Sequence, residues 1–190
     1  AGLSLAGLLL VGGLARAESP GSLSGARAAP PFVWTKLQSE LERERKIISR
    51  CRADIEGCTN PAARRFIAII EEGVRYEGKA RIAHINRAAN FAIRSTPKPM
   101  QNWTTPLAAL EAGAGDCKQF TVLKYAALIE AGLRAHDLRI LIVEDKARRA
   151  THAVIAARAG TQWLVLNNRT STLVEYGDFQ CPRCAGAHPV

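Results

Sequence analysis

Cys117 is the side chain of this sequence best suited to covalent chemistry. It follows Gly113-Ala114-Gly115-Asp116, whose two glycines indicate backbone that passes close to other groups just before a helix begins. A thiol attacks as a thiolate, which is favoured by the unpaired N–H groups and dipole of a helix N-terminus, and by Lys118. We therefore expect a lowered thiol pKa, with the same N–H groups serving as an oxyanion hole. The alternative is a buried, inert cysteine.

His152 is the base that the sequence places best for this thiol. Arg158-Ala159-Gly160-Thr161 predicts a tight turn between two strands, and if Ala159-Gly160 is its two-residue loop, His152 lies directly opposite Asn167. Directly opposed side chains share a face, so Asn167 would orient the imidazole and complete a Cys-His-Asn triad. The alternative is a structural histidine bound to backbone. The remaining histidines, all in segments typical of the surface, are His84, His136 and His188.

The elements that position these residues are helices first and strands later. Apolar residues recur at helical spacing, which predicts helices over 34–50, from Pro61, over 79–94 and from Pro106. Asp116 followed by Gln119 predicts a capping box for the helix that Cys117 begins. Strands are predicted over 138–143, 151–157 and 162–166. This order indicates an α+β fold with an antiparallel sheet.

The bulk properties indicate one globular, exported domain. Of 190 residues, 47% are hydrophobic and 23% charged, and the net charge of +9 is scattered over amphipathic segments, so we expect no nucleic-acid partner. Residues 1–17 have the apolar run and A-x-A site of an incomplete secretory signal peptide. Residues 18–31 have the composition of a linker. No later segment is apolar for long enough to form a stable membrane span, which predicts a periplasmic or secreted protein.

The five cysteines agree with an oxidising compartment. Cys51 and Cys58 have the spacing of a small disulfide loop. Cys181 and Cys184 form a second close pair, which leaves Cys117 alone. An unpaired cysteine outside the cytoplasm requires an explanation, and nucleophilic catalysis supplies one.

Several stretches resemble the bacterial transglutaminase-like cysteine proteinases. These stretches are Arg50–Cys58, Asn86–Asn90, Trp103–Pro106, Gly113–Cys117, Lys124-Tyr125, Thr151–Val154 and Trp163–Arg169. The resemblance covers about residues 32–170 and implies a papain-like or transglutaminase-like fold and periplasmic proteolysis. It implies Cys117 as nucleophile and His152 as base, with Trp103 and Asp116 supporting the oxyanion hole. The implied partners are a protein substrate, in some members a large cell-surface adhesin, and an inner-membrane regulatory receptor.

Two positions depart from the family pattern. The family usually has Asp where this chain has Asn167, whose amide oxygen can orient an imidazole but stabilises imidazolium less than a carboxylate does. Calcium-dependent members often continue D-C-E-D, whereas this chain has Lys118 and Gln119 after the cysteine. Because a cation and an amide replace two anionic ligands, we expect no metal site and no calcium dependence.

The last residues resemble a different family. Residues 172–184 are similar to the first strand and active-site turn of bacterial thioredoxin-fold disulfide oxidoreductases, with Cys181 and Cys184 as the redox pair. Residues 171–190 are therefore predicted to be a truncated start of such a fold or a non-native tail. The favoured hypothesis for the chain is a cysteine peptidase. The alternatives are a catalytically weak, substrate-binding relative and a thiol-disulfide exchange protein.

Overall fold

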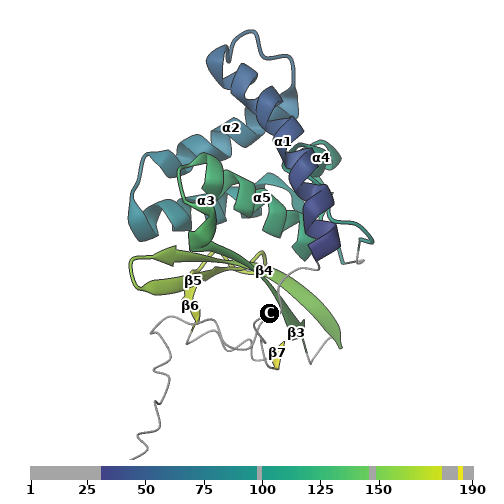
Figure 1. Ribbon diagram of the computed structural model, residues 1–190, viewed down its shortest axis with the longest axis vertical. Helices are drawn as coiled ribbons and strands as arrows, with labels where there is room; N and C mark the ends of the chain where they lie inside the picture. The colour runs from purple at the N-terminus through teal and green to yellow at the C-terminus, as the bar shows by residue number, and fades with distance from the viewer. Residues whose placement is uncertain (1–30, 98–99, 146–148, 177–183, 186–190) are drawn as a thin grey trace, which may run out of the picture.

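Helices form one layer of the protein and a sheet forms the other (Figure 1). The computed structural model describes residues 31–97, 100–145, 149–176 and 184–185. The helices are α1 (Pro31–Ala53), α2 (Pro61–Val74), α3 (Gly78–Ala92), α4 (Pro106–Ala112), α5 (Cys117–Glu130) and the short 3-10 helix η1 (Ala135–Asp137). The predicted signal peptide, most of the predicted linker, Cys181 and His188 lie outside the described residues.

The main sheet is antiparallel and has the strand order β6-β5-β4-β3-β7. Its strands are β3 (Leu138–Asp145), β4 (Ala150–Ala159), β5 (Gln162–Leu166), β6 (Val174–Glu175) and β7 (Cys184–Ala185). A separate parallel pair joins β1 (Arg94–Ser95) to β2 (Ala114–Gly115). The predicted α+β order, helices followed by an antiparallel sheet, is confirmed.

A local sequence signal sets the start of α2. Asn60 caps α2, because its side-chain oxygen accepts the Ala63 N–H at 2.9 Å, and Pro61 is the first helical residue. The third helix ends earlier than predicted, at Ala92, because Arg94 and Ser95 pair with β2 instead of continuing the helix.

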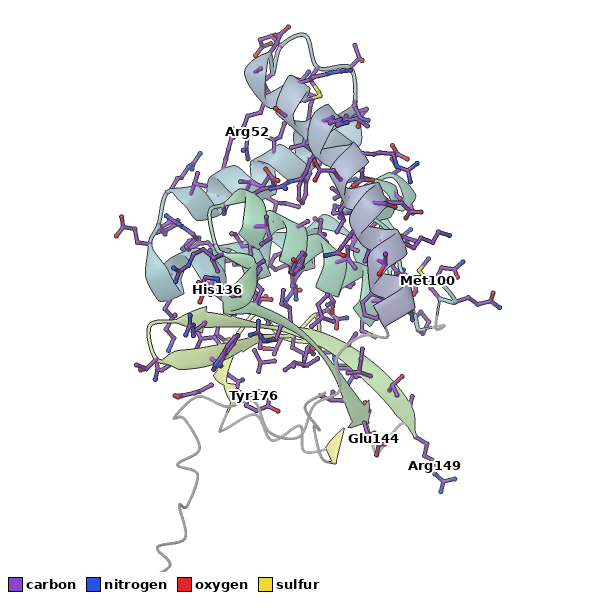
Figure 2. The ribbon with its side chains drawn as sticks, in the orientation of Figure 1. Arg52, Met100, His136, Glu144, Arg149 and Tyr176 are labelled. Atoms are coloured by element: carbon purple, nitrogen blue, oxygen red, sulfur yellow. A yellow bond between two sulfur atoms is a disulfide. The ribbon has the colours of Figure 1, made fainter. Side chains whose placement is uncertain are left out.

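The core lies between α5 and the sheet, and β4 is covered on both faces. Ile155 and Ala157 belong to the main core with the buried side chains of α5, such as Phe120. Side chains alternate along a strand, and Val154 and Ala156 belong to a second apolar cluster on the other face. In Figure 2, Tyr176 lies on the side of the sheet away from the helices, where it packs against this second cluster.

The register of the β4–β5 hairpin differs from the predicted one. Ala159 pairs with Gln162, so the two-residue loop is Gly160-Thr161. The predicted loop, Ala159-Gly160, is wrong, and each β4 residue faces a β5 position two residues further along the chain than predicted. Gly160 has φ +63°, and a glycine at the first loop position accommodates the positive φ of a tight hairpin turn. A shift of two residues keeps every side chain on its face, so His152 and Asn167 still share a face, as diagonal neighbours.

The predicted disulfide between Cys51 and Cys58 is formed and joins the end of α1 to the turn before α2. Both cysteines are buried. Within the described ranges, no helix is long and apolar enough to cross a membrane.

Candidate active site

Cys117 is the first residue of α5, as predicted. The Asp116 side chain accepts the Lys118 N–H at 2.9 Å, and the Gln119 side chain accepts the Asp116 N–H at 3.0 Å. This is the capping box that the sequence predicted. The helix therefore begins at Cys117, the residue that the sequence predicts to be the nucleophile.

Gly115 allows the backbone to pass close to the capping residues. A Cβ at this position would lie 2.6 Å from the Cβ of Gln119, a separation that side chains do not tolerate. The backbone here is held by the β1–β2 pair and by the Thr96 N–H, which donates to the Gly115 carbonyl at 2.9 Å. The close approach predicted for these glycines is thus present at Gly115.

Arg65 of α2 braces the two helices that lead into this pair of short strands. Its guanidinium donates to the Leu110 carbonyl at 2.8 Å and also to the Ala92 carbonyl. These carbonyls belong to the last turns of α4 and α3, which lack helical N–H partners. The Arg65 side chain therefore holds the ends of α3 and α4, the two helices that β1 and β2 follow. The chain continues from β2 to Cys117.

The thiol lies against the edge of β4, where β5 has left the sheet. The β4–β5 ladder ends at the pair Ile155 and Leu166, although β4 continues to Ala150. In that stretch the Ala153 N–H lies close enough to the Cys117 sulfur to lower the pKa of the thiol. The Cys117 sulfur therefore lies near the residue that follows His152.

Burial raises the pKa of the Cys117 thiol, which is the opposite of the direction expected from the sequence. The Ala153 N–H opposes this effect, the Asp116 carboxylate adds to it, and the charges of Lys118 and Arg169 oppose it. The thiol is half-buried in the folded protein, and the prediction made from the helix start did not include this tertiary effect. The isolated thiol is thus protonated at neutral pH and requires a base.

His152 is buried, and its Nε2 lies 3.0 Å from Oδ1 of Asn167. The same oxygen accepts the Arg169 N–H at 3.1 Å, which identifies this atom as the acceptor because a backbone N–H only donates. Nε2 of a neutral His152 therefore carries the hydrogen, and Nδ1 is the acceptor nitrogen. This tautomer is the one that can take a proton from a thiol.

The loop that carries Asn167 is held by amide side chains of α3. Asn90 donates to the carbonyls of Asn167 and Thr170 at 3.0 and 3.1 Å. Asn86 donates to the carbonyl of Ser171 at 3.2 Å and is fully buried. The two asparagines are four residues apart and share a helix face. These asparagines lie in a stretch that carries the family resemblance, and the structure shows that they hold this loop.

Arg169 and Asp145 form an ion pair that the sequence analysis missed. The guanidinium of Arg169 lies 2.8 Å from Oδ2 of Asp145 at the end of β3, and the Asp145 side chain is 1% exposed. Asp145 lies diagonally to His152 across the β3–β4 ladder, on the same face. The pair therefore ties the loop after β5 to β3 beside the imidazole.

The other predicted site residues have mixed outcomes. Trp103 is half-buried, and its indole makes no hydrogen bond to any residue that the structure describes. Asp116 acts as the helix cap. Cys184 lies in β7, which pairs with the end of β3, but Cys181 is outside the described residues, so the redox pair stays a prediction.

Arg169→Met should lower the free energy of unfolding by about 3 kcal/mol, because it leaves the buried Asp145 carboxylate without its guanidinium partner. Urea unfolding of the purified protein measures this effect. Arg134→Met is the matched control: its side chain is 70% exposed in its ion pair with Asp137, and screening limits the change to less than about 1 kcal/mol. Equal losses in the two variants would contradict a structural role for the Arg169 pair.

Comparisons with known proteins agree with this architecture. The family model of the bacterial transglutaminase-like cysteine proteinases matches residues 47–180, which extends past the predicted domain end at residue 170. No curated protein sequence matches the chain.

Among solved structures, LapG from Legionella pneumophila superposes with a TM-score of 0.59 and 19% identity, over 75% of this chain and 80% of that one. Its calcium-bound form gives 0.59 and 20%, over 75% and 80%. Its EGTA-treated form gives 0.58 and 19%, over 75% and 78%. At these identities the likeness shows the fold. Together with the family match, it shows that the chain belongs to the bacterial transglutaminase-like cysteine proteinase family and is a cysteine peptidase of that type.

Proposed function

We propose that this peptidase hydrolyses a peptide bond in a protein substrate outside the cytoplasm, with Cys117 as nucleophile, His152 as base and Asn167 as the residue that orients the base. The observation that carries the proposal is the arrangement at the edge of β4. The Cys117 sulfur lies near the N–H of Ala153, while Nε2 of the neighbouring His152 lies 3.0 Å from Oδ1 of Asn167.

The reaction begins with proton transfer from the thiol to Nδ1 of His152. The sulfur forms a bond to the scissile carbonyl carbon, and the carbonyl oxygen becomes an oxyanion. The imidazolium then donates its proton to the leaving amine as the C–N bond breaks, which leaves an acyl-thioester on Cys117. Water, deprotonated by His152, attacks this thioester, and the thiol returns as the acid is released.

The oxyanion needs donors that are already in place. The Cys117 N–H at the start of α5 supplies one, because the next N–H along the helix, that of Lys118, is already bound to the Asp116 side chain. Trp103 supplies another, since its indole N–H makes no hydrogen bond within the described part of the chain. The segment that carries Trp103 is fixed by Gln119, whose Nε2 donates to the Asn102 carbonyl at 2.7 Å.

The raised pKa of the Cys117 thiol determines how the nucleophile is activated. A thiol with a depressed pKa would exist as a preformed thiolate-imidazolium pair. Because burial raises the pKa of the Cys117 thiol, the resting thiol is protonated, and in this proposal His152 removes the proton as attack occurs. Reactivity at neutral pH therefore depends on the imidazole.

Export is supported by the Cys51–Cys58 disulfide, because such bonds persist outside the cytoplasm. The substrate class that the family resemblance favours is a large cell-surface adhesin. An inner-membrane receptor would then control access to this substrate, as the same resemblance implies.

The family resemblance also raises the question of calcium beside the nucleophile. Both carboxylate oxygens of Asp116 already accept N–H donors, from Lys118 and Met100. Gln119 accepts the Asp116 N–H and donates to Asn102. A hard divalent cation prefers several oxygen ligands, and an ammonium among them is unfavourable. These residues do not fit calcium, and we propose that the enzyme works without a metal or other cofactor.

The purified protein should cleave a large surface adhesin of the same bacterium, and gel electrophoresis measures this cleavage. Cys117→Ser should abolish cleavage, and Asn167→Ala should lower kcat by about 10²-fold, within the roughly 10²–10⁴ contributed by a positioned base. Asn167→Asp should retain activity and move the acid limb of kcat/KM to higher pH, because a carboxylate favours the imidazolium. Cleavage that persists in Cys117→Ser would reject the proposed nucleophile, and an adhesin left intact by the wild type would reject this substrate class.

Iodoacetamide alkylation tests the activation of the thiol without a substrate. At pH 7 the wild type should react roughly tenfold or more faster than His152→Ala. Because burial raises the pKa of the Cys117 thiol, the variant's rate should rise only above the ordinary thiol range near ~8.5. Peptide mass spectrometry assigns the label to Cys117.

The control for this measurement is His136→Ala. It removes an exposed imidazole from η1, which follows the end of α5, whereas Cys117 is at the start of α5. Its alkylation profile should match the wild type. Identical profiles for wild type and His152→Ala would show that His152 is not the base.

A further inference from the structure

Lys118 places a positive charge on the carboxylate that precedes the nucleophile. Its Nζ lies 2.6 Å from Oδ2 of Asp116, and the two side chains are 18% and 10% exposed. The Met100 N–H donates to the same oxygen at 2.6 Å, and the Lys118 N–H donates to Oδ1 at 2.9 Å. Asp116 is thus a nearly dry carboxylate surrounded by donors, one of them a full cation.

The donors around Asp116 join two separate parts of the chain. Met100, labelled at the side of the helical layer in Figure 2, belongs to the segment before α4. The fully buried Gln119 fixes the same segment through the carbonyl of Asn102. The two residues after Cys117 therefore help to pin the segment that leads to Trp103 against the start of α5.

We propose that Lys118 is a positioning residue. Its ammonium is a positive charge built into the chain beside Cys117, where a bound divalent cation would otherwise supply that charge. The assignment rests on the proposed role of Cys117. The ammonium neutralises Asp116, leaves its other lone pairs to the backbone donors, and needs no ion from solution.

The same charge acts on the nucleophile. The Asp116 carboxylate disfavours the Cys117 thiolate, and the Lys118 ammonium offsets it. Without the ammonium, a carboxylate one residue from the sulfur would oppose ionisation at every turnover. The position of Lys118 therefore serves both the local structure and the reactivity of the thiol.

The first experiment compares the purified full chain in calcium chloride and in EGTA. We expect the wild type to have the same thermal unfolding midpoint and the same Cys117 alkylation rate in both. Lys118→Met should alkylate roughly tenfold more slowly at pH 7, because the Asp116 carboxylate then acts on the thiol without the Lys118 charge that offsets it, and calcium should not restore the rate. Lys118→Arg should recover most of the rate because it keeps the charge.

The matched control is Lys79→Met, which removes the same charge from an exposed position on α3 and should leave the alkylation profile unchanged. A complementary variant, Lys118→Glu with Gln119→Asp, removes the tethered cation and adds two carboxylates beside Asp116. The thermal unfolding midpoint of this double variant should be higher in calcium chloride than in EGTA.

Three results would overturn the inference: a calcium-dependent midpoint in the wild type, wild-type alkylation by Lys118→Met, or no calcium response in a folded double variant. None of these measurements uses a peptide substrate. A failure of adhesin cleavage with these readouts intact would therefore count against the proposed function and not against the role of Lys118.

Discussion

The structure of the site depends on the point where β5 separates from β4. Beyond the pair Ile155 and Leu166, β4 continues to Ala150 and, among the described residues, pairs there with β3 alone. The N–H of Ala153 is then able to bind the Cys117 sulfur, a contact that a longer ladder would replace with a strand carbonyl. The same separation lets Asn167 turn toward His152. One interruption of a regular ladder therefore leaves Cys117 and His152, the proposed nucleophile and base, at the same edge of β4.

A polar framework replaces the backbone hydrogen bonds that the departing strand no longer makes. Amide side chains of α3 hold the carbonyls of the loop, and Arg169 ties it to Asp145. Buried polar groups are expensive unless they are paired, so these contacts specify one loop conformation instead of several. The helical layer contributes rigidity through α5, which packs on β4.

Local rules predicted the parts of this site that depend on neighbours in sequence. The capping box at Asp116, the helix start at Pro61 and the disulfide each need residues less than ten positions apart. The hairpin register was wrong because one glycine fits either loop position, yet the shared face of His152 and Asn167 survived because strands have a period of two. The raised thiol pKa and the Asp145–Arg169 pair were missed because burial and distant partners arise only on folding.

The apolar cluster on the outer face of β4 bears on where the folded unit ends. Tyr176 covers part of that cluster, and β6 pairs with β5, so residues beyond 170 shield apolar side chains such as Val154 from water. A version of the protein cut at residue 170 would present bare β-sheet surface and an unpaired strand edge, both of which promote self-association. Recombinant versions meant to stay dispersed at high concentration therefore need the chain at least through Tyr176.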